Sequence, residues 1–149
     1  MSSDKNIKHK VEDGDNMQVV VCIDDNNGMM FNHRRLSKDR VVIDRIVEST
    51  KEKRLFINTY SCELFEKVKN VVACTDFLYQ AGENDICFVE SDSLLEFESK
   101  IDKLTVYRWN RSYPADFYFD LPLDKWKLVK CSDLAGNSHD RITEEIYTR

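Results

Sequence analysis

The sequence lacks any long apolar run, and its longest ones fall far short of the roughly 20 residues that a membrane-spanning helix needs. The N-terminus is polar and lacks the apolar core of a secretory signal. The chain also contains no internal repeat and no low-complexity tract. We therefore expect a cytoplasmic protein that makes no contact with a membrane.

An excess of basic residues is also missing, since 22 Lys and Arg face 27 Asp and Glu for a formal net charge of −5. This balance argues against charge-driven binding of nucleic acid. No two cysteines have the spacing of metal ligands, so we expect no zinc site and reduced, mostly buried thiols. The five cysteines are Cys22, Cys62, Cys74, Cys87 and Cys131.

Apolar residues are plentiful enough for a core, at 42% of a 149-residue chain. Residues 1–16 are charged and aperiodic, which predicts a flexible polar tail. Residues 17–149 are then expected to form one domain.

Short apolar runs alternate with helical patterns along this domain. We predict strands at 17–23, 54–59, 71–74, 86–89, 103–109, 115–119, 126–131 and 142–147. Helices are expected from Ser37, as N-cap, to Lys51–Lys53, and at 61–67, 76–81 and 93–99. The order predicts an α/β fold with a mostly parallel sheet, flanking helices and an antiparallel C-terminal hairpin.

The segment from Val19 to Ile46 is the most informative. A buried strand leads through a polar turn and a basic loop into a helix, which places Asp39 near the carboxyl edge of the sheet. Open α/β sheets bind ligands at this edge. Asp39 could hold a protonated ring or act as a general acid or base, or it could simply stabilise the helix N-terminus.

On these residues the chain resembles dihydrofolate reductase. Val20 to Met29 is similar to that family's first strand and mobile loop, and Leu36–Asp39 resembles its Leu-Pro-x-Asp motif. The end of the chain, from Phe119 through Asn137-Ser138-His139 to Tyr147, is similar to the family's closing hairpin. The resemblance implies a dihydrofolate-reductase-like fold and puts Asp39 in the position of the acid that holds the pterin ring.

The half of the family pattern that binds NADPH is not reproduced. Glu90-Ser91-Asp92 stands where the family has a Gly-Gly pair beside the cofactor pyrophosphate, and side chains there block the backbone's approach. Asn58-Thr59-Tyr60-Ser61 stands in place of Gly-Arg-x-Thr. We therefore expect that the usual NADPH-dependent reductase activity is lost.

The expected ligand is planar or anionic, pterin-like or nucleotide-like. Eight residues are predicted to contact it: Ile23, Met29, Phe31, Arg34, Arg35, Asp39, Tyr107 and Arg108. The basic residues from Asn32 to Arg35, with Arg40, could form an anion-binding lip, or could pair with Asp24, Asp25 or Asp44. The segment from Tyr107 to Asp116 could clamp a base, or could be a strand end whose aromatic residues pack.

Other polar residues have two interpretations as well. His33 and His139 could transfer protons, although a loop histidine is usually just exposed. Asp24 and Asp25 could hold Mg²⁺ through water, or could serve their own turn.

Four functions remain open from the sequence. The first is a small-molecule-binding domain, with Asp39 as a candidate catalytic acid, and the second is an NADPH-dependent reductase with an altered cofactor site. The third is a ribonuclease or phosphodiesterase, because 26–35 and 108–116 also resemble short bacterial chains called ribonuclease Z. The His-x-His-x-Asp-His motif of a two-zinc hydrolase is absent from the sequence, whose histidines are His9, His33 and His139. The fourth is a protein-interaction module.

Overall fold

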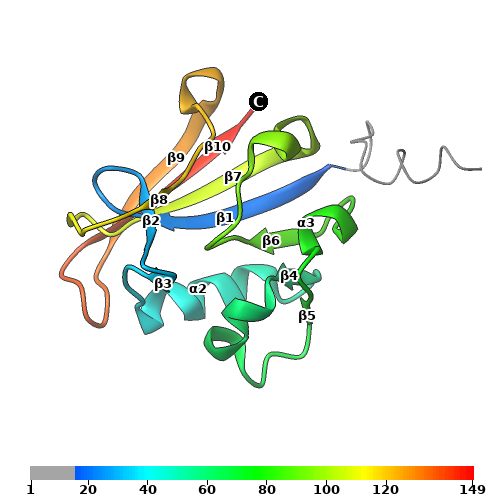
Figure 1. The fold of residues 1–149 in the computed structure, drawn as a ribbon, viewed down its shortest axis with the longest axis horizontal. Coiled ribbons are helices and arrows are strands. Elements are labelled where there is room, and N and C mark those ends of the chain that lie inside the picture. The colour runs from blue at the N-terminus through cyan, green and yellow to red at the C-terminus, as the bar shows by residue number, and fades with distance from the viewer. Residues whose placement is uncertain (1–15) are drawn as a thin grey trace, which may run out of the picture.

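The computed structural model describes residues 16–149, and Figure 1 shows their fold. A seven-stranded sheet has the strand order β5-β4-β6-β1-β7-β10-β9. The strands are β1 (Met17–Ile23), β4 (Leu55–Ile57), β5 (Val71–Ala73), β6 (Ile86–Phe88), β7 (Ile101–Arg108), β9 (Lys127–Leu134) and β10 (Ile142–Thr148). Strands β5, β4, β6, β1 and β7 run parallel to one another, and β10 runs antiparallel to both β7 and β9. The predicted α/β class, mostly parallel sheet and antiparallel C-terminal hairpin are confirmed.

Strand β1 lies in the middle of the sheet, with β6 on one side and β7 on the other. Five of its seven residues are buried, as expected for an apolar strand covered on both faces. One face carries Val20, which packs with Val42 and Ile46 of helix α2 (Arg40–Thr50). The opposite face carries Val19, Val21 and Ile23, which belong to a second core.

The second core is covered by short elements. They are helix α3 (Phe77–Gln80), the 3-10 helix η2 (Leu95–Lys100), strand β2 (Gly28–Phe31) and strand β8 (Phe117–Tyr118). Strand β2 pairs with β8 and with β3 (Arg34–Arg35) in a separate three-stranded sheet. Figure 1 shows this small sheet crossing the end of β1, beside the start of α2.

Helix α2 begins two residues later than predicted. Asp39, not Ser37, is its N-cap, and the Asp39 carboxylate accepts a hydrogen bond from the N–H of Val41 at 2.9 Å. The prediction of Ser37 is therefore wrong, because both residue types suit the position and local sequence does not choose between them. At the other end, Asn70 donates to the carbonyls of Thr50 and Lys53 at 2.9 and 2.7 Å and so satisfies the helix terminus.

The predicted basic loop at 32–35 is also wrong, because it is part of a tight hairpin. Asn32 and His33 have positive φ angles of 51° and 63°, as a two-residue turn between β2 and β3 requires. Arg34 and Arg35 therefore lie on a strand. The short helix expected at 61–67 is a 3-10 helix, η1 (Thr59–Phe65), and the strand expected at 115–119 is the two-residue β8.

The predictions from composition concerned membrane-spanning helices, the cysteines and the N-terminal tail. No helix in residues 16–149 is long and apolar enough to span a membrane. All five cysteines are free, but the prediction that most are buried is wrong. Only Cys87 is buried, Cys22 and Cys74 are half-buried, and Cys62 and Cys131 are exposed. The tail predicted for residues 1–16 falls, apart from Asn16, outside the described residues.

Candidate functional site

The centre of the site is the carboxylate of Asp39 at the start of α2. One of its oxygens accepts hydrogen bonds from the backbone N–H groups of Val41 and Asn137, at 2.9 and 2.8 Å. The other accepts from the N–H and hydroxyl of Ser138, at 2.8 and 3.1 Å, and lies 2.9 Å from Nδ1 of His139. The Asp39 side chain is fully buried. It therefore ties the loop between β9 and β10 onto the helix, and its oxygens are engaged by the protein itself.

These contacts keep Asp39 ionised. Burial by itself would raise the pKa of the carboxyl group. Donation from Asn137, His139, Ser138 and Val41 outweighs burial and holds the pKa of Asp39 well below its usual range. An ionised carboxylate only accepts hydrogen bonds, so the nitrogen facing it, Nδ1 of His139, carries a proton.

His139 is buried and not, as a loop histidine would usually be, exposed. Its ring stacks on the indole of Trp109, with centroids 4.6 Å apart and an interplanar angle of 22°. Its Nε2 lies 2.9 Å from Oγ of Ser37 and 3.3 Å from the hydroxyl of Tyr113. The imidazole thus has the Asp39 carboxylate at 2.9 Å and the Ser138 hydroxyl at 3.2 Å from Nδ1, and two further hydroxyl groups near Nε2.

Gly136 allows the β9–β10 loop to lie close against the Asp39 carboxylate. A Cβ atom at this position would lie 2.6 Å from the Asp39 carboxylate and 2.8 Å from both the carbonyl oxygen of His139 and a methyl group of Ile142. Contacts this short force some neighbour to move. The geometry of the loop against Asp39 thus depends on the missing side chain.

A second polar cluster, which we call the Arg35 cluster, fills the carboxyl edge of β4 and β6. It comprises Arg35, Ser61, Glu63 and Glu90. Arg35 donates to both oxygens of Glu90, from Nε at 2.8 Å and from Nη2 at 3.0 Å, and also pairs with Glu63. The hydroxyl of Ser61 donates to Glu90 at 2.7 Å. The guanidinium lies 4.8 Å from the ring centre of Tyr60.

The cluster is largely removed from water, since the side chains of Arg35 and Glu90 are 13% and 10% exposed. Burial would lower the pKa of Arg35, but its bonds to Glu90 and Glu63 raise it above its usual value. The bond from Arg35 lowers the pKa of Glu63. An arginine therefore occupies the edge at which open α/β sheets commonly bind ligands.

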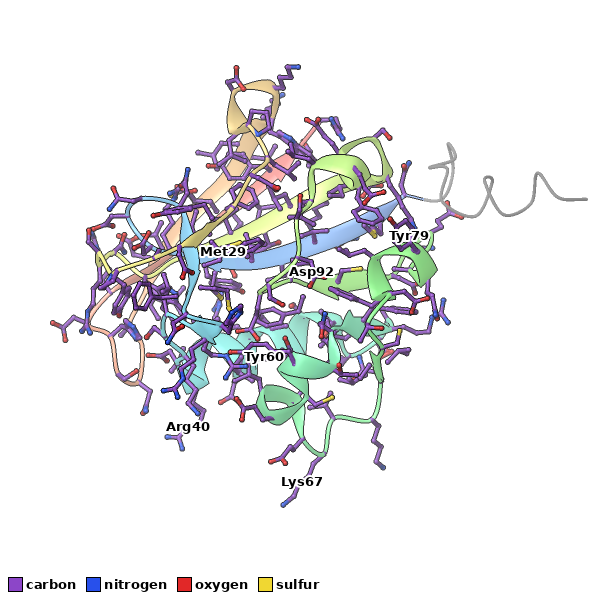
Figure 2. All side chains as sticks on the ribbon, in the orientation of Figure 1. Met29, Arg40, Tyr60, Lys67, Tyr79 and Asp92 are labelled. Atoms are coloured by element: carbon purple, nitrogen blue, oxygen red, sulfur yellow. The ribbon has the colours of Figure 1, made fainter. Side chains whose placement is uncertain are left out.

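A hollow of about 350 Å³, which we call the α2–η1 pocket, remains open between the start of α2, helix η1 and the β9–β10 loop. Its walls include the aliphatic side chains of Ile43 and Leu64. Two cations, Lys38 and Arg40, and two carboxylates, Asp39 and Glu63, line the same hollow. Both carboxylates are already held by protein groups, Asp39 by the β9–β10 loop and Glu63 by Arg35. Figure 2 shows Arg40 reaching outward from the start of α2. The size is within the range of ligand pockets.

The structure does not bring the eight predicted ligand residues together. Ile23 and Met29 are buried in the second core, whereas Tyr107 packs in the core under α2. Phe31 and Arg34 are exposed near the tip of the β2–β3 hairpin. Arg35 and Asp39 stand in the two clusters described above.

The segment from Tyr107 to Asp116 has the contacts of a packed strand end. The hydroxyl of Tyr107 donates to Glu144 at 2.6 Å, and Arg108 pairs with Glu145 at 2.6 Å. Burial, together with the bond to Glu144, raises the pKa of Tyr107. Trp109 is also buried. Tyr107 and Arg108 are thus both held by β10.

Asp24 serves its own turn and the following loop. Its buried carboxylate accepts from the N–H groups of Asn26, Gly28 and Tyr113, at 2.8, 2.7 and 2.9 Å. Asp116 likewise accepts from the N–H of Asn32 at 3.0 Å. Among residues 16–149, no group of three or more His, Cys, Asp or Glu side chains is placed to hold a metal ion. His9 lies outside the described residues.

Arg35 pairs with Glu63 and Glu90. The alternative interpretation, in which the basic residues pair with Asp24, Asp25 or Asp44, is therefore wrong for Arg35. Arg40 reaches Oδ1 of Asn137 at 3.4 Å. Sequence reasoning missed the contribution of Ser37, Ile43, Glu63 and Leu64. Ile43 was expected in the core, and Ser37 as a helix cap, so neither carried a signal for the site.

Comparison with known proteins agrees with this fold. No protein-family model and no curated protein sequence matches the chain. Among solved structures, the chain is similar to dihydrofolate reductase from Enterococcus faecalis, described as complexed with NADP(H) and RAB-propyl. The TM-score is 0.65 at 11% sequence identity, over 90% of this chain and 96% of that chain. The chain therefore has a dihydrofolate-reductase-like fold, and the resemblance seen in the sequence is confirmed at that level.

The residues at the carboxyl edge do not fit a dinucleotide held as the resemblance implies. Glu90 lies two residues after the end of β6 and is bound to Arg35. A hollow of about 190 Å³ beside it includes Asp76, Asp92 and Glu96 in its lining. Carboxylates repel a pyrophosphate group, and the structure offers no glycine at positions 90–92 for close backbone approach.

Proposed function

We propose that this protein binds a small ligand with an apolar, planar body and a negative charge in the α2–η1 pocket. One observation carries the proposal: two cations and two aliphatic side chains share one open hollow of ligand size, next to a carboxyl edge that the protein fills itself. The two carboxylates of the same hollow, Asp39 and Glu63, are paired with His139 and Arg35 and so leave the charge of Lys38 and Arg40 available. An arginine fork suits a carboxylate or phosphate, and apolar walls suit a ring.

The same observation supports the loss of NADPH-dependent reduction. A dinucleotide bound at that edge would meet Arg35 already paired with Glu90, and displacing Arg35 would leave Glu90 buried without its partner, which is a costly arrangement. The altered reductase stays the second candidate only if the Arg35 cluster opens.

The test is a thermal-shift titration with folate, AMP and NADPH as probes. A ligand that binds only the folded state stabilises it by about 2.7 kcal/mol at 100 times its Kd. We expect folate or AMP to raise the melting temperature, and NADPH to leave it unchanged.

Arg40→Ala should weaken the binding of the effective probe by roughly 10-fold to 150-fold, in line with one lost charged hydrogen bond. The matched control is Arg141→Ala, because Arg141 is exposed on the β9–β10 hairpin and makes only a long ion pair of 3.7 Å with Asp133. A shift with NADPH alone, or equal affinity in both variants, would contradict the proposal.

A further inference from the structure

Ser37, His139 and Asp39 form a connected row of hydrogen-bonding groups. Oγ of Ser37 lies 2.9 Å from Nε2 of His139, and Nδ1 of the same ring lies 2.9 Å from Oδ2 of Asp39. Nucleophilic catalysis by serine needs these three parts: a hydroxyl, a base within reach of it, and a carboxylate that orients the base. The three residues come from the β3–α2 connection and, 100 positions later, from the β9–β10 loop.

The protonation states follow from the same contacts. Asp39 accepts bonds from three backbone N–H groups and is ionised, so Nδ1 of His139 carries the ring proton. In the neutral ring, Nε2 is then an acceptor, and the hydroxyl of Ser37 can donate to it. This is the tautomer that a general base beside a serine requires.

The ring is also fixed in place. Trp109 stacks on one face at 4.6 Å, and the Asp39 carboxylate holds its Nδ1 edge. The hydroxyl of Tyr113 lies farther from Nε2 than Ser37 does, at 3.3 Å against 2.9 Å. Ser37 is half-buried whereas His139 and Asp39 are buried, so Ser37 is the most exposed residue of the row.

We propose that Ser37 is a nucleophile that accepts an acyl group from small esters, with His139 as general base and Asp39 as positioning residue. The ester would occupy the α2–η1 pocket, so the substrate class rests on the proposed function. Lys38 and Asp39 follow Ser37 in the chain, and Lys38, Asp39 and Arg40 all line that pocket, as do Asn137 and Ser138 next to His139. The positive charge of Lys38 and Arg40 suits an ester that carries an anionic group.

Oγ of Ser37 bonds to the acyl carbon while its proton passes to Nε2 of His139. The bond from the acyl carbon to the alcohol oxygen then breaks, and the alcohol leaves with the proton from Nε2. Water then gives a proton to Nε2 as its oxygen bonds to the acyl carbon. The bond from that carbon to Oγ breaks, the acid leaves, and Nε2 returns the proton to Oγ of Ser37.

The test uses a fluorophosphonate probe, which reacts with activated serines, followed by peptide mass mapping. We expect the label on Ser37, no label in Ser37→Ala, and labelling at least about 100-fold slower in His139→Gln, as for loss of a general base. Ser99→Ala is the matched control, because Ser99 is an exposed serine outside the site, and it should label at the wild-type rate.

A second measurement uses p-nitrophenyl acetate. One equivalent of p-nitrophenol should be released in a burst, with an acetyl group found on Ser37 by mass. Thermal melts establish that the variants are folded, and Ser37→Ala is the variant that keeps the Asp39–His139 contact intact.

The proposal is overturned if folded wild-type protein takes no label, or if Ser37→Ala labels as fast as wild type. Its failure can be told apart from failure of the pocket. If folate or AMP raises the melting temperature but the fluorophosphonate does not label Ser37, the role of Ser37 as nucleophile alone is refuted. If the fluorophosphonate labels Ser37, but folate or AMP binds Arg40→Ala and Arg141→Ala with equal affinity, the pocket alone is refuted.

Discussion

Replacing Gly136 by alanine tests whether the packing of the β9–β10 loop on Asp39 is as tight as described. The added Cβ would lie 2.6 Å from the Asp39 carboxylate and 2.8 Å from the His139 carbonyl oxygen. The His139 oxygen belongs to the backbone, and the Asp39 carboxylate is held by five hydrogen bonds, so moving either one would weaken the packing or break hydrogen bonds.

Overpacking of this kind typically costs about 1–3 kcal/mol of unfolding free energy. For a domain of this size, each kcal/mol corresponds to roughly 4 °C in melting temperature. We therefore expect Gly136→Ala to melt about 4–12 °C below wild type. The backbone amides of Asn137 and Ser138, which donate to Asp39, should also exchange faster with deuterium.

Gly82→Ala is the matched control, since nothing lies within 4 Å of a Cβ atom built on Gly82. Alanine at such a position stabilises or leaves stability nearly unchanged, because the unfolded chain loses freedom. Equal melting temperatures for the two variants, with unchanged exchange at Asn137 and Ser138, would refute the described packing.

Two further predictions concern the charged clusters. Arg35→Ala leaves Glu90 buried without its partner and should lower the free energy of unfolding in urea by about 3 kcal/mol. Adding Glu90→Gln to that variant should recover part of the lost stability. No recovery would contradict a direct pairing of Arg35 with Glu90. Because the pKa of Asp39 is lowered in the folded state, its ionised form contributes stability that is complete above its unfolded pKa of about 3.9 and is lost as the pH falls below it. The stability gap between wild type and Asp39→Asn should therefore be constant from pH 5 to 7 and narrow below about pH 4 in urea unfolding, and a gap that widens in acid would contradict this sign.

Most strands could be predicted from the sequence because each is an apolar run bounded by polar residues. Met17–Ile23 is the clearest case, since it is buried on both faces and needs no alternation. The hairpin of β2 and β3 was missed because its turn is Asn32-His33, whose positive φ angles carry no glycine signal.

The site was less predictable, because its parts meet only in three dimensions. Asp39 and His139 each drew attention in the sequence, but 100 residues separate them and no local pattern joins them. Glu90 was recognised as unsuited to a pyrophosphate, yet its partner Arg35 lies 55 residues earlier. Sequence periodicity reports which face of an element is apolar, and it does not report which distant side chains pair.

The place of β10 in the sheet has a consequence for how the chain folds. β10 lies between β7 and β9 and follows both in the sequence, so β9 has no partner in the sheet until β10 is in place. Leu128 and Val129 on β9 are about half exposed even in the native state. Pairings between segments distant in the chain form slowly, and unpaired strands in partly folded chains associate with one another. Insertion of β10 is therefore expected to be a late step, and the rate of that step sets how long β9 stays open to aggregation.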